Sequence, residues 1–177
     1  MNDLIAEHGR RAVAAAQGEP LLDMPVGTAY FTVDIARMHD GVVVGADIAP
    51  GMVLRAAENA RAAGVANLSV VGADAHALPF ADGSFGAVMC HNGLQVIPGL
   101  TEALSELARV VAPGGMLYVS VVHTPLGAAL PRRAAKHLPT AFRSGRDVER
   151  EIEAAGFSVT AFERHRLAYL LEAVRTL

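Results

Sequence analysis

Three aspartates follow apolar runs in the first half of the sequence, where their carboxylates could accept hydrogen bonds from a ligand. Asp23 follows LL, Asp47 ends GVVVGAD and Asp74 ends NLSVVGAD. An acidic residue at the end of a second strand can accept hydrogen bonds from both hydroxyls of a ribose. Asp74 could accept a hydrogen bond from the amino group of an adenine. Each aspartate alone has a structural alternative, because this residue type often caps a helix or forms a turn.

The segment LLDMPVGTAYFT, residues 21–32, has the order of a strand, a tight turn and a helix. Gly27 permits a backbone bend and the close approach of a ligand. Nucleotide-binding loops usually carry two or three glycines, whereas this loop carries one. A single glycine turn needs no ligand, so the prediction of a binding site depends on the ordered set of aspartates.

Two histidines follow later apolar runs. His91 ends FGAVMCH and His123 follows GMLYVSVV. Either could act as a general base for a reacting group that carries a proton of high pKa. The alternative is that both only line a cavity or the surface, with His91 a satisfied histidine near the surface.

The apolar runs predict buried parallel strands, since each run is nearly continuous rather than alternating. A helix over 50–64 places Met52 and Ala56 on one face, and a second helix begins at Leu100 and breaks at Pro113. Alternating strands and helices imply right-handed crossovers and an open, doubly wound sheet. The five predicted strands cover residues 20–24, 41–47, 67–74, 85–91 and 115–122.

The end of the chain has a different order. A helix is predicted over 145–156, and two strands follow at 157–165 and 167–175 with only Arg166 between them. Strands joined so closely must pair antiparallel. The predicted fold is therefore α/β, a doubly wound, seven-stranded, mostly parallel sheet with an antiparallel C-terminal hairpin. Ligands bind such sheets beyond the carboxyl ends of the strands.

Composition excludes several classes of protein. The 177 residues, 52% of them hydrophobic, fit one domain over 1–177. A net charge of -3 argues against a nucleic-acid partner. A lone cysteine, Cys90, excludes an internal disulfide and favours a reducing, cytoplasmic location. The sequence shows neither a secretory leader pattern nor an integral membrane segment.

Taken together, the motifs resemble those of class I S-adenosylmethionine-dependent methyltransferases, over about residues 21–177. LLDMPVGTAYFT resembles the first motif of that family, and VVVGADIAPGM resembles its second-strand motif. VVGADAHALPFADGSFGAVMC resembles the stretch that contacts adenine, and LARVVAPGGMLYVSVV the segment that leads into the fifth strand. HNGLQVIPGLTEALSELARV is similar to ubiquinone and menaquinone C-methyltransferases.

The resemblance implies a Rossmann-like fold and the transfer of a methyl group from S-adenosylmethionine to a small-molecule or lipid-like acceptor, which leaves S-adenosylhomocysteine. Such an in-line displacement depends mostly on alignment and desolvation, and it needs no metal. Asp47 is expected to hold the ribose and Asp74 the adenine. The complete expected cofactor set is Asp23, Pro25, Gly27, Ala29, Asp47, Ile48, Met52, Asp74, Ala75 and His91.

The first motif departs from the family pattern, with Pro25 and Ala29 at two positions that are usually glycine. If Ala29 needed a positive φ, it would cost ~1 kcal/mol or more relative to glycine, or a factor of about five to ten in affinity. The loop is therefore expected still to bind. Gly86 stands where the family often has aspartate, and Ala49 replaces a common serine N-cap.

Two segments bear on the acceptor. The predicted N-terminal helix, within 1–19, is short where relatives often have a longer lid, so the lid is minimal, supplied by a partner subunit such as a second copy, or lost. The segment 123–147 mixes apolar and basic residues and is a candidate lid. Its alternative is a solvated connecting helix.

Two other functions fit parts of the sequence. A nicotinamide dehydrogenase would also place an acidic residue like Asp47 after a glycine like Gly27, but G-x-G-x-x-G is absent and the terminal hairpin stays unexplained. A degenerate fold that acts as a non-catalytic binding or partner subunit would agree with Ala29 and the short N-terminus.

Overall fold

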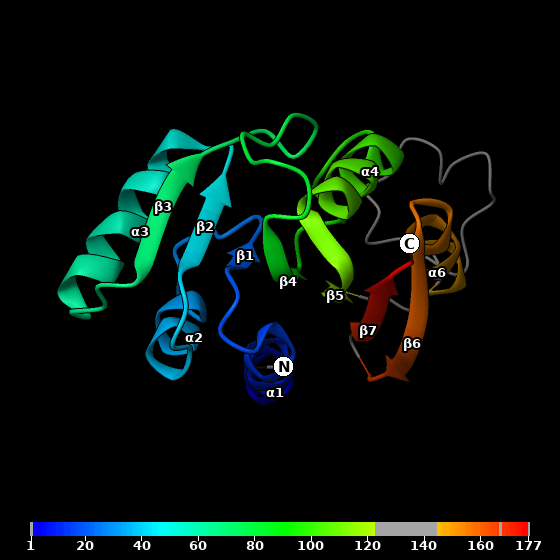
Figure 1. The fold of residues 1–177 in the computed structure, drawn as a ribbon, viewed down its shortest axis with the longest axis horizontal. Coiled ribbons are helices and arrows are strands. Elements are labelled where there is room, and N and C mark those ends of the chain that lie inside the picture. Colours follow the sequence, from blue (N-terminus) through cyan, green and yellow to red (C-terminus); the bar gives the residue numbers. More distant parts are fainter. Residues whose placement is uncertain (1, 123–144, 167, 177) are drawn as a thin grey trace.

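The chain folds around one seven-stranded sheet (Figure 1). The computed structural model describes residues 2–122, 145–166 and 168–176. The strand order is β3-β2-β1-β4-β5-β7-β6. Strand β7 pairs antiparallel with both β5 and β6, and the other neighbouring pairs are parallel. The predicted fold class is confirmed. The strands are β1 (Leu21–Asp23), β2 (Val43–Asp47), β3 (Leu68–Gly72), β4 (Phe85–His91), β5 (Val111–Val122), β6 (Phe157–Arg164) and β7 (Ala168–Arg175).

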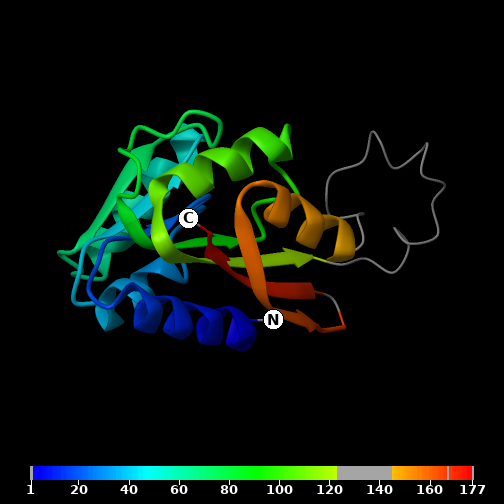
Figure 2. The ribbon, with the colours of Figure 1, turned by 45° about the vertical axis from the view of Figure 1, so that its right-hand side comes forward.

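Helices cover both faces of the sheet, as the right-handed crossovers require. Figure 2 shows α4 and α6 on one side of the sheet and α1 on the other. Among the described residues, no helix is long and apolar enough to cross a membrane. The helices are α1 (Asn2–Ala16), α2 (Thr32–Met38), α3 (Pro50–Ala62), α4 (Leu100–Val110) and α6 (Gly145–Ala154).

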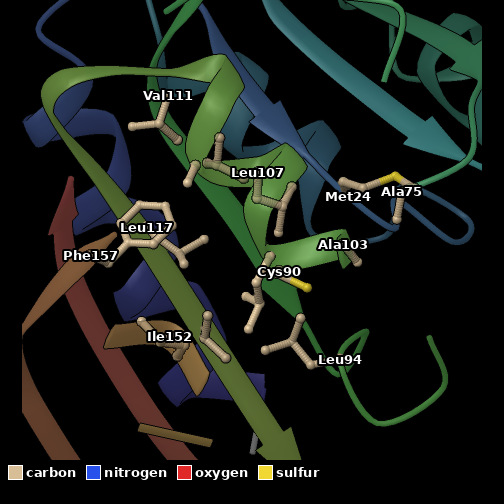
Figure 3. Close-up of a cluster of buried hydrophobic side chains, with 14 of the residues drawn as sticks. Met24, Ala75, Cys90, Leu94, Ala103, Leu107, Val111, Leu117, Ile152 and Phe157 are labelled. Carbon is tan, nitrogen blue, oxygen red and sulfur yellow. The ribbon is translucent and has the colours of Figure 1, made fainter. Parts of the chain in front are cut away.

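Two hydrophobic clusters, one on each face, hold the layers together, because successive strand residues point to opposite faces. On β4, Val88 and Cys90 point into the cluster under α4 and α6, whereas Ala87 and Met89 join the cluster under α1, α2 and α3. Figure 3 shows the first of these clusters, in which Leu107 of α4 lies over the sheet. Both faces of the central strands are thus excluded from water.

The two predicted central helices form, with corrections at their ends. In α3, Ala56 is buried as predicted, but Met52 is 44% exposed because it lies at the carboxyl edge of the sheet. The second helix ends at Val110, ahead of Pro113, and β5 begins at once. The pairing register between β4 and β5 then shifts within Phe85–Ala87, since the residues around Pro113 bulge out of the ladder.

The predicted C-terminal hairpin also forms, and β7 inserts between β5 and β6. Of the candidate lid 123–147, only the last residues, which begin α6, lie among the described residues. His123 lies outside them. The predicted N-terminal helix is present as α1, which packs against β4 and β5 on the face of the sheet.

Close packing explains why position 86 is glycine, where the family often has aspartate. A Cβ atom at Gly86 would lie 2.8 Å from Glu19 Cβ and 3.2 Å from the Ala16 carbonyl oxygen. The end of α1 therefore packs so closely on β4 that no side chain fits at this position.

We expect Gly86→Ala to lower the free energy of unfolding by about 1 to 3 kcal/mol, because the backbone at Ala16 must move to admit the methyl group. Urea unfolding measures the change. Gly51→Ala is the control, since a Cβ atom at Gly51 meets no atom within 4 Å and alanine is the better helix former. Equal stability of the Gly86→Ala variant and the parent would contradict this packing.

Candidate cofactor and acceptor site

Two adjoining pockets open at the carboxyl ends of the central strands and share Pro25 and Gly27. The larger pocket has a volume of about 350 Å³ and the smaller about 190 Å³. The larger pocket is lined by Met24, Pro25, Gly27, Asp47, Ile48, Met52, Asp74, Ala75, His76, Val96, Ile97 and Pro98. The smaller pocket is lined by Asp23, Pro25, Val26, Gly27, Thr28, Tyr30, Phe31, Thr32 and His91.

Nine of the ten expected cofactor residues therefore line the two pockets, and Ala29 lines neither. Val96, Ile97, Pro98 and His76 are pocket residues that the sequence prediction missed. Residues 96–98 belong to an irregular segment between β4 and α4. Only the return of the chain across the sheet edge brings this segment opposite Ile48 and Met52.

Asp47 joins the loops that follow the first two strands. Its Oδ2 accepts the Gly27 N–H at 3.0 Å, and its Oδ1 accepts the Ala49 N–H at 2.9 Å. A carboxylate can accept about four hydrogen bonds, so each oxygen keeps capacity for one more donor. Gly27 has a φ of 55°, and a Cβ atom there would meet no atom within 4 Å, so the backbone is open to the pocket.

The walls of the larger pocket suit a flat apolar group with polar edges. Ile48 and Val96 are 66% and 69% exposed, although isolated side chains of this kind favour burial. Asp74 supplies a carboxylate at one side, and Asp47 supplies another at the neighbouring strand end.

Ala29 adopts a positive φ, a conformation that the glycine usual at this position of the family motif would adopt without strain. Its φ is 58°, and its side chain is fully buried in the cluster under α2 and α3. The methyl group thus points into the core, away from the pockets. The cost of the left-handed conformation falls on folding, and the space for a ligand is unchanged.

Asp23 is a buried carboxylic acid at the floor of the smaller pocket. Burial raises its pKa from 3.8 to about 7, the Thr32 hydroxyl lowers it by donating a hydrogen bond at 2.5 Å, and the Asp47 charge raises it. Asp23 is therefore close to half protonated at neutral pH, and a nearby cation would favour its ionised form.

His91 contributes a neutral ring to the same pocket. Burial and the neighbouring His8 lower the pKa of His91 to about 3. Its Nδ1 lies 3.3 Å from Ser120 Oγ, which also lies 3.3 Å from Asn92 Oδ1. Among the described residues, the buried Nε2 atom has no hydrogen-bond partner, whereas Nδ1 has one in Ser120.

His8 on α1 is a functional neighbour that sequence reasoning missed. Its ring lies 5.6 Å from the His91 ring and 5.3 Å from the Tyr118 ring. Burial lowers the pKa of His8, whereas Glu172, 3.6 Å from Nε2, raises it. No local signal marks His8, because only tertiary packing brings α1 against β4, β5 and β7.

We expect Asp23→Asn to stabilise the ligand-free protein, increasingly as pH rises. The folded pKa of about 7 exceeds the unfolded value of 3.8, so ionisation destabilises the folded state as pH rises from the lower value through the higher. The gain should be small near pH 4 and about 1 to 4 kcal/mol near pH 8.

Urea unfolding at several pH values measures this gain. Asp34→Asn is the control, because Asp34 is an exposed acid on α2 that lines neither pocket, so its replacement removes no buried carboxyl group. A gain at Asp23 that does not grow with pH would show that the carboxylic acid is not held in a raised-pKa environment.

Comparison with known proteins agrees with this geometry. The family described as a methyltransferase domain matches residues 21–115. The chain is 44% identical over 115 residues to a demethylmenaquinone methyltransferase of Beutenbergia cavernae, covering 64% of this chain and 45% of that protein. It is 33% identical over 167 residues to one of Mycobacterium bovis, covering 94% and 63% respectively. The chain thus spans about half the length of the curated relatives it matches.

Solved structures share the fold. The [4+2]-cyclase SpnF superposes with a TM-score of 0.86 at 21% identity, covering 99% of this chain and 82% of that one. A SAM-dependent methyltransferase from Aquifex aeolicus superposes with a TM-score of 0.79 at 21% identity, covering 96% and 88%. These identities show the fold alone, but the family match spans more than half of the chain. The chain belongs to the methyltransferase-domain family.

Proposed function

We propose that the chain binds S-adenosylmethionine across both pockets and transfers its methyl group to a small-molecule acceptor of the quinol type. The observation that carries the proposal is the row of carboxylates Asp23, Asp47 and Asp74 at the ends of adjacent strands, around two pockets that share Gly27. This row matches the hydroxyls, amino group and positive charges of that cofactor.

The residues present fit the cofactor. The apolar walls at Ile48 and Val96 suit adenine, and the unused lone pairs of Asp47 suit the ribose hydroxyls. Asp23 lies in the smaller pocket, where its ionised form would offset the positive end of the methionine part. When bound, the cofactor would supply a methyl group on a positively charged sulfur. The sulfur leaves as a neutral thioether, which is a good leaving group.

The contribution of the chain is mainly alignment and exclusion of water. With a pKa of about 3, His91 is a poor general base near neutral pH, because a catalytic base works best when its pKa is near the working pH. The predicted base role of His91 is therefore not favoured. The same role for His123 stays a prediction outside the described residues.

The identity of the acceptor is supported by the curated relatives, whose names specify demethylmenaquinone. We therefore propose an apolar, hydroxylated aromatic ring as the group that is methylated. We also propose that the chain is a single domain over 1–177 with a cytoplasmic location. The proposal keeps the segment 123–147 as a candidate substrate lid and a homodimer as the oligomeric state. The alternative of a non-catalytic subunit is based on Ala29 and on the short N-terminus. Ala29 does not support it, since its methyl group points away from the pockets.

We expect Asp47→Ala to weaken S-adenosylhomocysteine binding by about 1.5 to 3 kcal/mol, because charge-assisted hydrogen bonds to the ribose are lost. Titration calorimetry gives the affinity, and thermal unfolding reports whether the loop that Asp47 holds stays folded. Asp34→Asn changes an exposed acid that lines neither pocket and should bind like the parent. Parent-like binding by Asp47→Ala would remove the assignment of Asp47.

We expect Ala29→Gly to leave S-adenosylhomocysteine affinity within about twofold of the parent, since the methyl group lies in the core. Stability should also change little, because relief of the left-handed strain, ~1 kcal/mol, offsets the lost burial of one methyl, ~0.8 kcal/mol. The same calorimetric titration and a urea melt measure both quantities. A large gain in affinity would mean that Ala29 restricts the pocket after all.

A further inference from the structure

His76 bridges two walls of the larger pocket. Its backbone N–H and its Nδ1 atom lie 2.9 Å and 2.7 Å from Asp74 Oδ1. Its Nε2 atom lies 2.7 Å from the Pro98 carbonyl oxygen on the opposite wall. Asp74 lies two residues after β3, whereas Pro98 lies two residues before α4, so one imidazole ring connects the segment after β3 with the segment before α4.

Both partners of the ring can only accept hydrogen bonds. A neutral imidazole has one N–H donor, whereas the imidazolium has two. The geometry with both short contacts therefore requires the doubly protonated ring. Among the residues that the structure describes, the charged groups near the ring are acidic, namely Asp74 and, beside Gly99, Glu102. The hydrogen bonds to Asp74 and Pro98 raise the pKa of His76, which is consistent with this form.

The other end of the segment that His76 contacts is attached by packing against the core and against Pro25. Leu94 is fully buried in the core. Gly93 packs on Pro25 so closely that a Cβ atom there would lie 2.1 Å from Pro25 Cδ. Between these contacts and His76, Val96 stands 69% exposed at the pocket. His76 contacts the Pro98 end of the same segment.

The same contacts orient Asp74. Both hydrogen bonds from His76 go to Oδ1, so Oδ2 keeps its full capacity to accept a donor from the pocket. Hydrogen bonding to the ionised form lowers the pKa of Asp74, with the His76 backbone contact the largest cause. The carboxylate is therefore charged and held in one orientation when a ligand arrives.

We propose that His76, in its doubly protonated form, holds the Val96–Pro98 segment of the pocket lining close to Asp74 through hydrogen bonds to both. This contact sets the affinity of the larger pocket for the adenosine part of the cofactor. This inference rests on the proposed function. His76 acts through Asp74 and Pro98 and is a positioning residue. When the ring loses a proton, it keeps the stronger bond to the Asp74 carboxylate and releases Pro98, so the wall loosens. Affinity should then fall as pH rises through the pKa of His76.

Asp23 complicates a direct test, since it ionises in the same range and should favour a cationic ligand as pH rises. The probe is therefore 5′-methylthioadenosine, which carries the adenosine part without the charged amino-acid end and so does not report on Asp23. Calorimetry gives its dissociation constant for the whole chain between about pH 5.5 and pH 9. We expect the constant to rise about three- to tenfold over this range.

His76→Gln is the test variant, because glutamine can donate to one partner but does not titrate. It should bind the probe with nearly the same affinity at every pH, close to the value of the parent at high pH. His165→Gln is the matched control, since His165 also pairs with a carboxylate two positions earlier, Glu163 at 3.2 Å, far from both pockets. This control should keep the pH dependence of the parent.

Nitrogen-15 NMR of the histidine rings gives a second measurement. The His76 ring should show two protonated nitrogens at low pH, and the probe should raise its pKa, because a ligand that prefers the protonated form must do so. A flat parent curve, or a His76→Gln curve as steep as that of the parent, overturns the inference. If the parent binds only S-adenosylhomocysteine, the test is the difference between the parent and His76→Gln curves with that ligand, because Asp23 contributes to both; a difference that does not change with pH then overturns the inference. Failure of the parent to bind either ligand overturns the proposed function itself.

Discussion

The whole site depends on the Asp47 carboxylate, which ties the loop after β1 to the loop after β2. It accepts the Gly27 N–H and the Ala49 N–H from two different loops and is only 6% exposed. The Val26 N–H, which donates to the Ala46 carbonyl at 2.8 Å, adds a backbone contact beside it. Because both pockets are lined by Pro25 and Gly27, their shared boundary exists only while this loop is held to β2.

Burial lowers the charge of the smaller pocket when it is empty. It raises the pKa of Asp23 and lowers that of His91, so the acid is partly protonated near neutral pH and the base is neutral. A cation that enters this pocket meets an acid that can ionise in response. The destabilising burial of Asp23 is therefore a cost on folding that binding can recover, a common balance between stability and function.

The N-terminal helix takes part in this environment as well as covering the sheet. His8 of α1 lies close to the rings of His91 and Tyr118, and its Nε2 atom lies 3.6 Å from Glu172 of β7. Arg11 donates to Glu172 at 2.6 Å, and the Tyr118 hydroxyl donates to the Arg11 carbonyl at 3.2 Å. These contacts connect α1 to three strands, so the position of α1 and the low pKa of His91 are linked.

Most of the fold could be predicted from the sequence, because burial on both faces of a parallel strand leaves a local trace. The continuous apolar runs place β1 to β5, and the close spacing at Arg166 requires the antiparallel pair. The aspartates at the strand ends could be found in the same way, since carboxyl ends of parallel strands share one edge. What they bind could be predicted only through resemblance to a family.

Tertiary structure decided the features that depend on contacts between distant segments. The direction of the Ala29 methyl group follows from how α2 packs, and the early end of α4 follows from pairing between β5 and β4. His8 approaches His91 because α1 crosses the sheet, and His76 reaches Pro98 because the chain returns over the edge of the pocket. In each case the residue type is visible in the sequence, whereas its partner is far along the chain. Hydrogen bonding and burial then depend on a packing that no local pattern encodes.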